Sequence, residues 1–174
     1  MNISLLTDEA VILRLSAKSS EPRPSNLLAL RVPPSGLIET WEQLRERTDN
    51  QVESLALWVG QYNHEMGYVT GVIYPEVFAH PLRVEMVENE RPVMGQWLRE
   101  KGLRVLAELH THQEEAFLSD VDQRYPLVSQ PGFLQIVVPY FAAGSMNWKS
   151  AAVFGLSRDG WYPIDPSLIQ SWEV

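Results

Sequence analysis

Two histidines and an aspartate lie within one short stretch of the sequence, and side chains of these types can share a metal ion. His110 and His112 stand one residue apart at the end of an apolar run typical of a β-strand. Because side chains alternate across a strand, both imidazoles project from the same face. Asp122 follows in a segment that begins like a helix. Two histidines and one aspartate leave a tetrahedral zinc with an open position for water, as a catalytic zinc site requires.

The serine before that aspartate also has a purely structural interpretation. Ser119 and Asp122 form an S-x-x-D pattern, which is far more often a helix N-cap than part of a catalytic site. The two roles are compatible, because a capping serine can still turn its hydroxyl toward a substrate. An HxH pair on a solvated sheet face would have the same sequence as a ligand pair. The combination favours a metal site, since two of only four histidines and this aspartate fall close together.

A hydrolytic zinc site also needs a general base that takes a proton from the attacking water. Glu53 stands at the head of an apolar run, where burial of a carboxylate without a partner would be costly. A solvent-exposed glutamate at the start of a strand would give the same pattern. Glu108 is the alternative base, because it precedes His110 by two residues and shares its strand face. The local sequence leaves both glutamates open.

Composition excludes several other kinds of protein. The chain has 174 residues, a net charge of −8 and no cysteine. The absence of cysteine excludes disulfides, thiolate nucleophiles, zinc fingers and iron–sulfur clusters. The acidic balance argues against nucleic acid as a partner, because duplex binding depends on cationic contacts to phosphates. The sequence has neither a signal-peptide pattern nor a run approaching ~18 apolar residues, so we expect a cytoplasmic protein without a membrane partner.

The elements around these residues alternate between strands and a few helices. The patterns predict strands over 9–16, 26–33, 52–60, 66–75, 80–88, 103–112, 133–140 and 149–157, and helices over 37–48, over 92–102 and from 119. Residues 61–65 would join two of these strands in a hairpin without the favoured two-residue turn. The order predicts an α/β (α+β) fold, with a mixed central β-sheet flanked by about three helices. We expect one domain over 1–174, with 1–33 as an N-terminal strand-pair extension and the tail packed back on the body.

The layout of these motifs resembles the JAMM (JAB/MPN) zinc metalloproteases. The matching elements are Glu53 in ESLALWVG, the triplet HTH ending at His112, and the S-x-x-D of Ser119. The resemblance covers residues 36–157 and implies the cytidine-deaminase-like JAB/MPN fold. Two departures stand out: Gln113 replaces a proline that often follows the second histidine, and the loop to Ser119 is one residue shorter than usual.

The resemblance also implies a role for each matched residue. His110, His112 and Asp122 would bind one Zn²⁺ ion. Glu53 would act as general base toward the attacking water and then as acid toward the leaving amine. Ser119 would donate a hydrogen bond to the developing oxyanion, and loss of one such donor typically costs about 10²–10³ in rate.

The function implied by the resemblance is a zinc-dependent isopeptidase or peptidase that cleaves after the C-terminus of a ubiquitin-like protein. The expected partners are that protein or its conjugate and other components of a bacterial conjugation operon, with a role in antiphage defence. The alternative is a catalytically inactive MPN-type binding or scaffold module that recognises a ubiquitin-like protein. A metal-dependent hydrolase of small molecules is a third hypothesis, but the sequence offers neither a Gly-rich phosphate loop nor a second metal cluster.

Overall fold

A mixed β-sheet forms the centre of the molecule. The computed structural model describes residues 1–7, 27–48, 52–80 and 83–172. The nine strands of the main sheet are β1 (Asn2–Leu5), β2 (Ala29–Val32), β3 (Leu55–Asn63), β4 (Met66–Tyr74), β7 (Arg104–Thr111), β8 (Leu134–Val138), β9 (Ala152–Ser157), β10 (Gly160–Ile164) and β11 (Ile169–Ser171). The hairpin of β5 (Val77–His80) and β6 (Arg83–Met86) is separate. The described helices are α2 (Pro34–Arg47), α3 (Glu90–Lys101) and α4 (Asp120–Arg124), with 3₁₀ turns at Tyr140–Ala142, Trp148–Ser150 and Pro166–Leu168.

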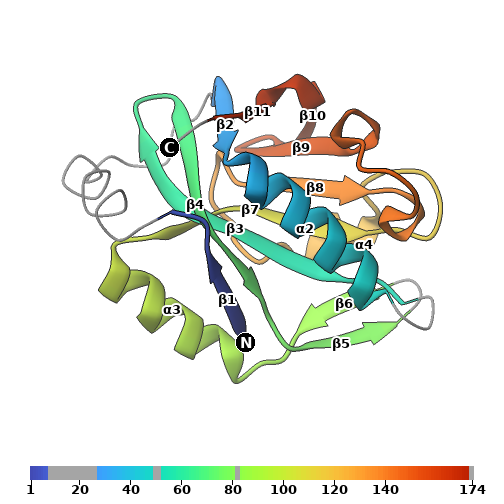
Figure 1. Ribbon diagram of the computed structural model, residues 1–174, viewed down its shortest axis with the longest axis horizontal. Helices are drawn as coiled ribbons and strands as arrows, with labels where there is room; N and C mark the ends of the chain where they lie inside the picture. The colour runs from blue at the N-terminus through green and yellow to red at the C-terminus, as the bar shows by residue number, and fades with distance from the viewer. Residues whose placement is uncertain (8–26, 49–51, 81–82, 173–174) are drawn as a thin grey trace.

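The sheet order places β3 and β7 in the middle. The strands run β10-β9-β8-β7-β3-β4-β2-β11, and β1 pairs with the free part of the β4 edge (Figure 1). The pairs β7–β8, β2–β4 and β2–β11 are parallel, and the other pairs in the sheet are antiparallel. The mixed sheet with three described helices confirms the predicted α+β architecture. No described helix is long and apolar enough to span a membrane.

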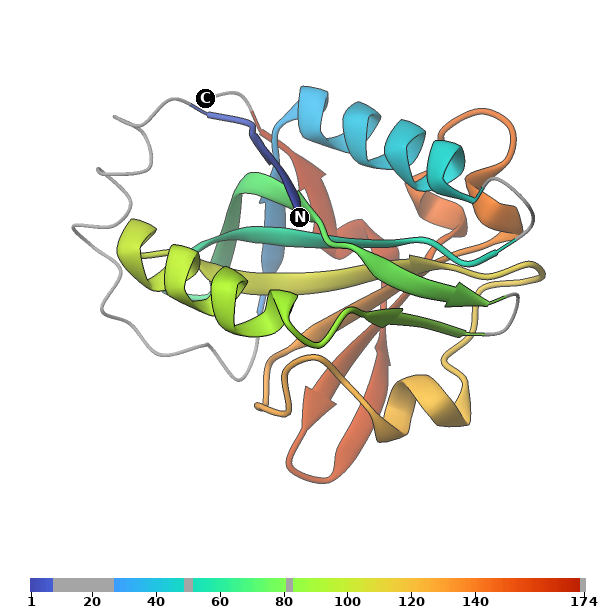
Figure 2. The same cartoon turned by 90° about the horizontal axis from the view of Figure 1, so that it is seen from below.

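Helices cover both faces of this sheet, as Figure 2 shows with α2 on one side and α3 on the other. Strand β3 is apolar on both faces because it is covered on both. Its Trp58 packs in one core cluster with Trp41 of α2, while its neighbour Leu57 packs in a second cluster with Leu98 of α3. Because side chains alternate between the two faces of the strand, β3 contributes residues to both cores. Residues at the ends of β3 and β7 therefore lie beside these buried cores.

Several predicted boundaries differ from the structure. The connection between β3 and β4 is only His64 and Glu65, because residues 61–63 continue the strand pairing, so the prediction of a longer turn was wrong. Residues 83–86 form the second strand of the β5–β6 hairpin, in place of one strand over 80–88. Strand β9 begins at Ala152, since Trp148–Ser150 form a 3₁₀ turn.

Both ends of the described chain join the sheet. The tail does pack back on the body, because β10 pairs with β9 and β11 pairs with β2. The sequence pattern did not predict β1, whose residues pair with β4. The strand expected over 9–16 lies outside the described residues, so the N-terminal strand pair and the single-domain division stay predictions.

Candidate metal centre

The end of β7 places both histidines on one side of the sheet. His110 is the penultimate residue of the strand, opposite Leu55 of β3 and Val137 of β8. His112 follows the strand, and its backbone N–H donates to the Val138 carbonyl at 2.9 Å, which extends the β7–β8 pairing by one step. The two imidazole centroids are 5.1 Å apart. The strand therefore presents both rings to the same small volume.

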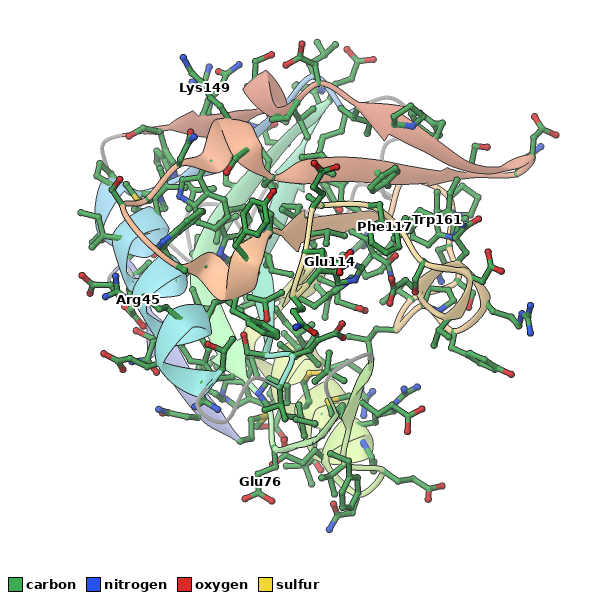
Figure 3. The ribbon with its side chains drawn as sticks, turned by 90° about the vertical axis from the view of Figure 1, so that its right-hand side faces the viewer. Arg45, Glu76, Glu114, Phe117, Lys149 and Trp161 are labelled. Carbon is green, nitrogen blue, oxygen red and sulfur yellow. The ribbon has the colours of Figure 1, made fainter. Side chains whose placement is uncertain are left out.

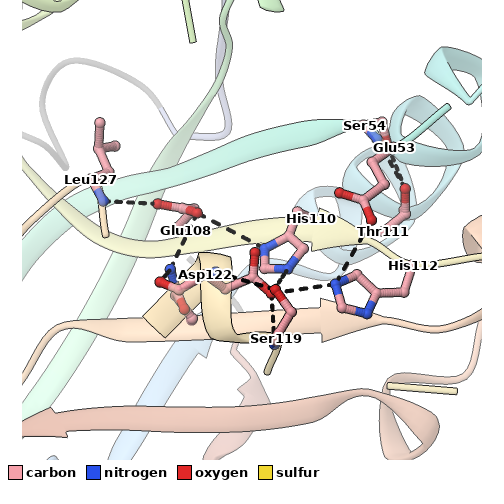
Figure 4. Close-up of polar contacts among 10 residues, drawn as sticks. Glu53, Ser54, Glu108, His110, Thr111, His112, Ser119, Asp122 and Leu127 are labelled. Atoms are coloured by element: carbon pink, nitrogen blue, oxygen red, sulfur yellow. Dashed lines mark hydrogen bonds and ion pairs between the residues drawn. The ribbon is translucent and has the colours of Figure 1, made fainter. Parts of the chain in front are cut away.

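Helix α4 brings the carboxylate of Asp122 to these rings through a capping box. The Ser119 N–H donates to Asp122 Oδ2 at 2.9 Å, and the Asp122 N–H donates to Ser119 Oγ at 3.2 Å. The same Oδ2 lies 3.5 Å from Nε2 of His110 and 3.5 Å from Nε2 of His112. The cap interpretation is thus confirmed, and the cap aims the carboxylate at the histidines (Figure 4). The short loop between His112 and Ser119 does not keep Asp122 away.

The spacing of these three residues fits a metal ion. One ligand atom from each of His110, His112 and Asp122 lies within 4.8 Å of the others. Two ligand atoms bound to a tetrahedral zinc at about 2.0–2.2 Å are about 3.3–3.5 Å apart, which matches both His–Asp separations. In the described part of the chain, neither ring nitrogen of the buried His110 has a hydrogen-bond partner. Buried polar groups left unpaired are costly, and a cation bound between the three side chains would satisfy Nε2.

Two glutamates stand on opposite sides of the histidine pair (Figure 4). Glu53 Oε1 is 3.9 Å from His112 Nε2, a nitrogen that points to the common centre. Glu108 Oε1 is 3.9 Å from His110 Nδ1, the ring nitrogen on the far side from Asp122. Only the first position adjoins the volume where a metal and a water would lie. The structure therefore brings Glu53 to the side that a general base needs, and it places Glu108 behind His110.

A buried polar pair holds Glu53 in place, and the sequence patterns did not reveal it. The Ser54 N–H donates to Thr111 Oγ1 at 3.0 Å, and the Thr111 N–H donates to the Ser54 carbonyl at 3.1 Å. The Ser54 hydroxyl donates to the Leu44 carbonyl of α2 at 2.8 Å. These bonds connect the segment before β3 to the end of β7 and to α2. The only signal in the sequence is that Thr111 separates the histidines and so faces the opposite side of the strand.

The charges of the centre perturb each other strongly. Burial raises the pKa of Glu53 to about 7, with Asp122 adding to the rise and His110 opposing it. Burial would raise the pKa of Asp122 as well, but His110, His112 and the Ser119 contact hold it well below its usual range. Burial opposes protonation of His110, yet the carboxylates of Asp122, Glu108 and Glu53 keep its pKa above the ordinary value. With three carboxylates around two imidazoles, the surroundings favour a cation.

A cavity of about 320 Å³ opens beside the centre. It is lined by Glu53, His112, Gln113, Glu114, Phe117, Ser119 and Val121. The Phe117 ring stands edge-on to the His112 imidazole at 4.8 Å and keeps 51% of its surface exposed. Figure 3 shows Glu114 and Phe117 on the face of the molecule that also carries α4. Of the five residues expected at the site, Glu53, His112 and Ser119 line this cavity, while His110 and Asp122 adjoin His112.

Comparison with known proteins finds a relative in sequence and a solved structure with a similar fold. The chain is similar to a probable metalloprotease. It is 25% identical over 122 residues to "Probable metalloprotease y4jG" of Sinorhizobium fredii, a match that covers 67% of this chain and 75% of the relative. No protein-family model matches. The fold is similar to the solution structure of protein DSY2949 from Desulfitobacterium hafniense, with a TM-score of 0.63, 20% identity, and coverage of 83% of this chain and 94% of that one.

The relative and the geometry agree on a coarse function. A distant homologue named as a probable metalloprotease, together with the His110, His112 and Asp122 group, indicates a metal-dependent hydrolase. The likeness to DSY2949 concerns the fold alone.

Proposed function

We propose that this protein is a zinc-dependent peptidase of the JAMM type. The observation that supports this most is the convergence of His110, His112 and Asp122 on one centre with Glu53 beside it. Two imidazoles and one carboxylate are a typical ligand set for catalytic zinc, which keeps a further position open. The open cavity adjoins the same residues, so a polypeptide could reach them.

In this proposal each residue of the site has its own role in amide hydrolysis. A zinc ion held by His110, His112 and Asp122 would activate a water molecule and polarise the scissile carbonyl. Glu53 accepts the proton of the attacking water at a carboxylate oxygen and later delivers it to the leaving amine. A carboxylate beside both the metal position and the cavity can carry out both transfers, because it accepts the proton in one step and returns it in the next.

Ser119 supplies the hydrogen bond to the developing oxyanion in this proposal. Its Oγ accepts the Asp122 N–H, and that bond uses a lone pair of the oxygen while leaving the hydroxyl proton free to donate. Ser119 also lines the cavity beside Glu53 and His112. A donor preorganised by a helix cap needs little rearrangement when charge develops on the substrate oxygen.

The substrate in this proposal is the C-terminal tail of a ubiquitin-like protein, in a precursor or in a conjugate. The support is the motif resemblance carried by Glu53, His110, His112, Ser119 and Asp122. An extended tail could add as a strand and use backbone hydrogen bonds for affinity. The partners would be the other enzymes of a bacterial conjugation pathway, with antiphage defence as its setting.

The test combines metal analysis with cleavage assays. Purified protein should contain about one zinc per chain and should cleave a ubiquitin-like conjugate or fusion until a chelator is added. Glu53→Gln should abolish cleavage while zinc stays bound, whereas Glu42→Gln, which changes an exposed acid on α2, should cleave normally. Absence of zinc, or full activity of Glu53→Gln, would overturn the mechanism. Zinc-loaded protein that binds a ubiquitin-like protein and cleaves nothing would favour the scaffold alternative.

A further inference from the structure

Glu108 is a partly buried carboxylate that the proposed mechanism leaves unused. It lies on β7, where it pairs with Leu57 of β3 and Gln135 of β8, and its side chain is 14% exposed. Carboxylates are rarely placed in such surroundings without a specific partner, because burial penalises the charged form. Its neighbours therefore indicate what it does.

Hydrogen bonds hold both oxygens of this carboxylate in place. The Leu127 N–H donates to Oε2 at 3.3 Å, and the Gln135 amide donates to Oε1 at 3.4 Å. The same Gln135 amide lies 3.4 Å from the Asp122 carbonyl of α4. Gln135 is 1% exposed, so this connection between Glu108 and the helix that carries Asp122 is shielded from water. The carboxylate is therefore oriented before any metal binds.

The oriented oxygen faces the ring nitrogen of His110 that the metal would not use. Nε2 of His110 is directed to Asp122, while Glu108 Oε1 lies 3.9 Å from Nδ1. When Nε2 binds a metal, Nδ1 must carry the proton of the ring, and a buried N–H needs an acceptor. The distance of 3.9 Å exceeds a hydrogen bond, so the ring must rotate toward Glu108 for the bond to form.

We infer that Glu108 is a positioning residue for the metal site: it accepts the Nδ1–H of His110 and fixes the ring with Nε2 toward the ion. This inference rests on the proposed metal site. Histidine ligands generally donate their second N–H to a carboxylate or carbonyl, and loss of that partner typically costs about 10–100-fold in metal affinity. The same geometry disfavours Glu108 as general base, because it lies beside Nδ1 of His110 and does not line the cavity that Glu53 lines.

The experiment measures zinc affinity by competition with a chromogenic chelator, at one pH, for the full chain. Glu108→Gln keeps the shape and an acceptor oxygen but removes the charge, and its affinity should fall about 10-fold, while Glu108→Ala should lose up to about 100-fold. Asp120→Asn is the matched control, because it removes one charge from the exposed start of α4 and should change affinity less than about 2-fold. Equal affinities of Glu108→Gln, Asp120→Asn and the natural chain would overturn the inference.

A second readout separates orientation from general stability. Nitrogen NMR of the zinc-loaded protein should show His110 with its proton on Nδ1 in a strong hydrogen bond, and Glu108→Gln should weaken that signal selectively. An unchanged Nδ1–H signal in the folded variant would show that Glu108 has only a structural role. Failure of the proposed function would give a different result. If the unsubstituted protein binds zinc, and binds it less tightly after Glu108→Gln, but cleaves no peptide bond, the proposed peptidase activity is contradicted. The positioning role of Glu108 then still stands.

Discussion

Replacing the candidate general base should stabilise the metal-free protein while it abolishes activity. Glu53 is 5% exposed, and burial raises its pKa from the ordinary 4.5 to about 7. The native state therefore holds a proton that the unfolded chain releases, and stability falls as the pH rises from about 4.5 to about 7. Glu53→Gln is neutral at every pH and does not lose this contribution.

The size of the effect follows from the same interval. At about 1.4 kcal/mol for each tenfold change in proton affinity, the rise from 4.5 to about 7 corresponds to about 3 kcal/mol. We expect Glu53→Gln to be about 2–3 kcal/mol more stable than the natural chain at pH 8 and about 1 kcal/mol or less at pH 5. For a chain of 174 residues this raises the melting temperature by about 5–10 °C at pH 8.

The assay is urea unfolding in the presence of a chelator at both pH values, with Glu42→Gln as the control for loss of one acidic charge. Zinc-loaded Glu53→Gln should also lose about 10²–10⁴ in cleavage rate, as expected for removal of a general base. The reasoning is refuted if the variant is no more stable than the natural chain at pH 8. It is also refuted if the gain in stability is the same at both pH values, since the cost of burying the Glu53 carboxylate must grow as that carboxylate ionises.

Three further substitutions examine how the fold supports the centre. Thr111→Val leaves the buried Ser54 N–H without its acceptor and should cost about 1–3 kcal/mol in urea unfolding, with slower cleavage because Glu53 loses its anchor. Gly60→Ala would place a Cβ 1.9 Å from the Tyr68 carbonyl oxygen, so we expect a loss of about 3 kcal/mol or more, or insoluble protein. Tyr140→Gly should raise stability by about 0.5–1 kcal/mol, because Tyr140 is half exposed and has a φ of 53°, which glycine adopts without strain; calorimetry would check it.

The grouping of His110, His112 and Asp122 could be predicted from sequence because each residue follows a local rule. The period of two on a strand places His110 and His112 on one face, and a helix cap determines where Asp122 points. The choice between Glu53 and Glu108 has no local rule. It depends on which imidazole nitrogen each carboxylate faces, and the pairing of β3 with β7 sets that arrangement across residues distant in the chain. Strand β11 could not be predicted for the same reason, because this three-residue strand is defined by its parallel pairing with β2, which is distant in the chain.

The centre illustrates why a metal site can be costly for the fold that carries it. Burial raises the pKa values of Glu53 and Glu108, and neither ring nitrogen of His110 has a hydrogen-bond partner among the described residues. These are unfavourable contributions at neutral pH, offset elsewhere by the two apolar cores on either face of the sheet. A divalent cation bound here would reverse the sign of these contributions, because it would favour ionised carboxylates and give His110 Nε2 a partner. The buried carboxylates that oppose folding are thus the ones that would favour a bound cation.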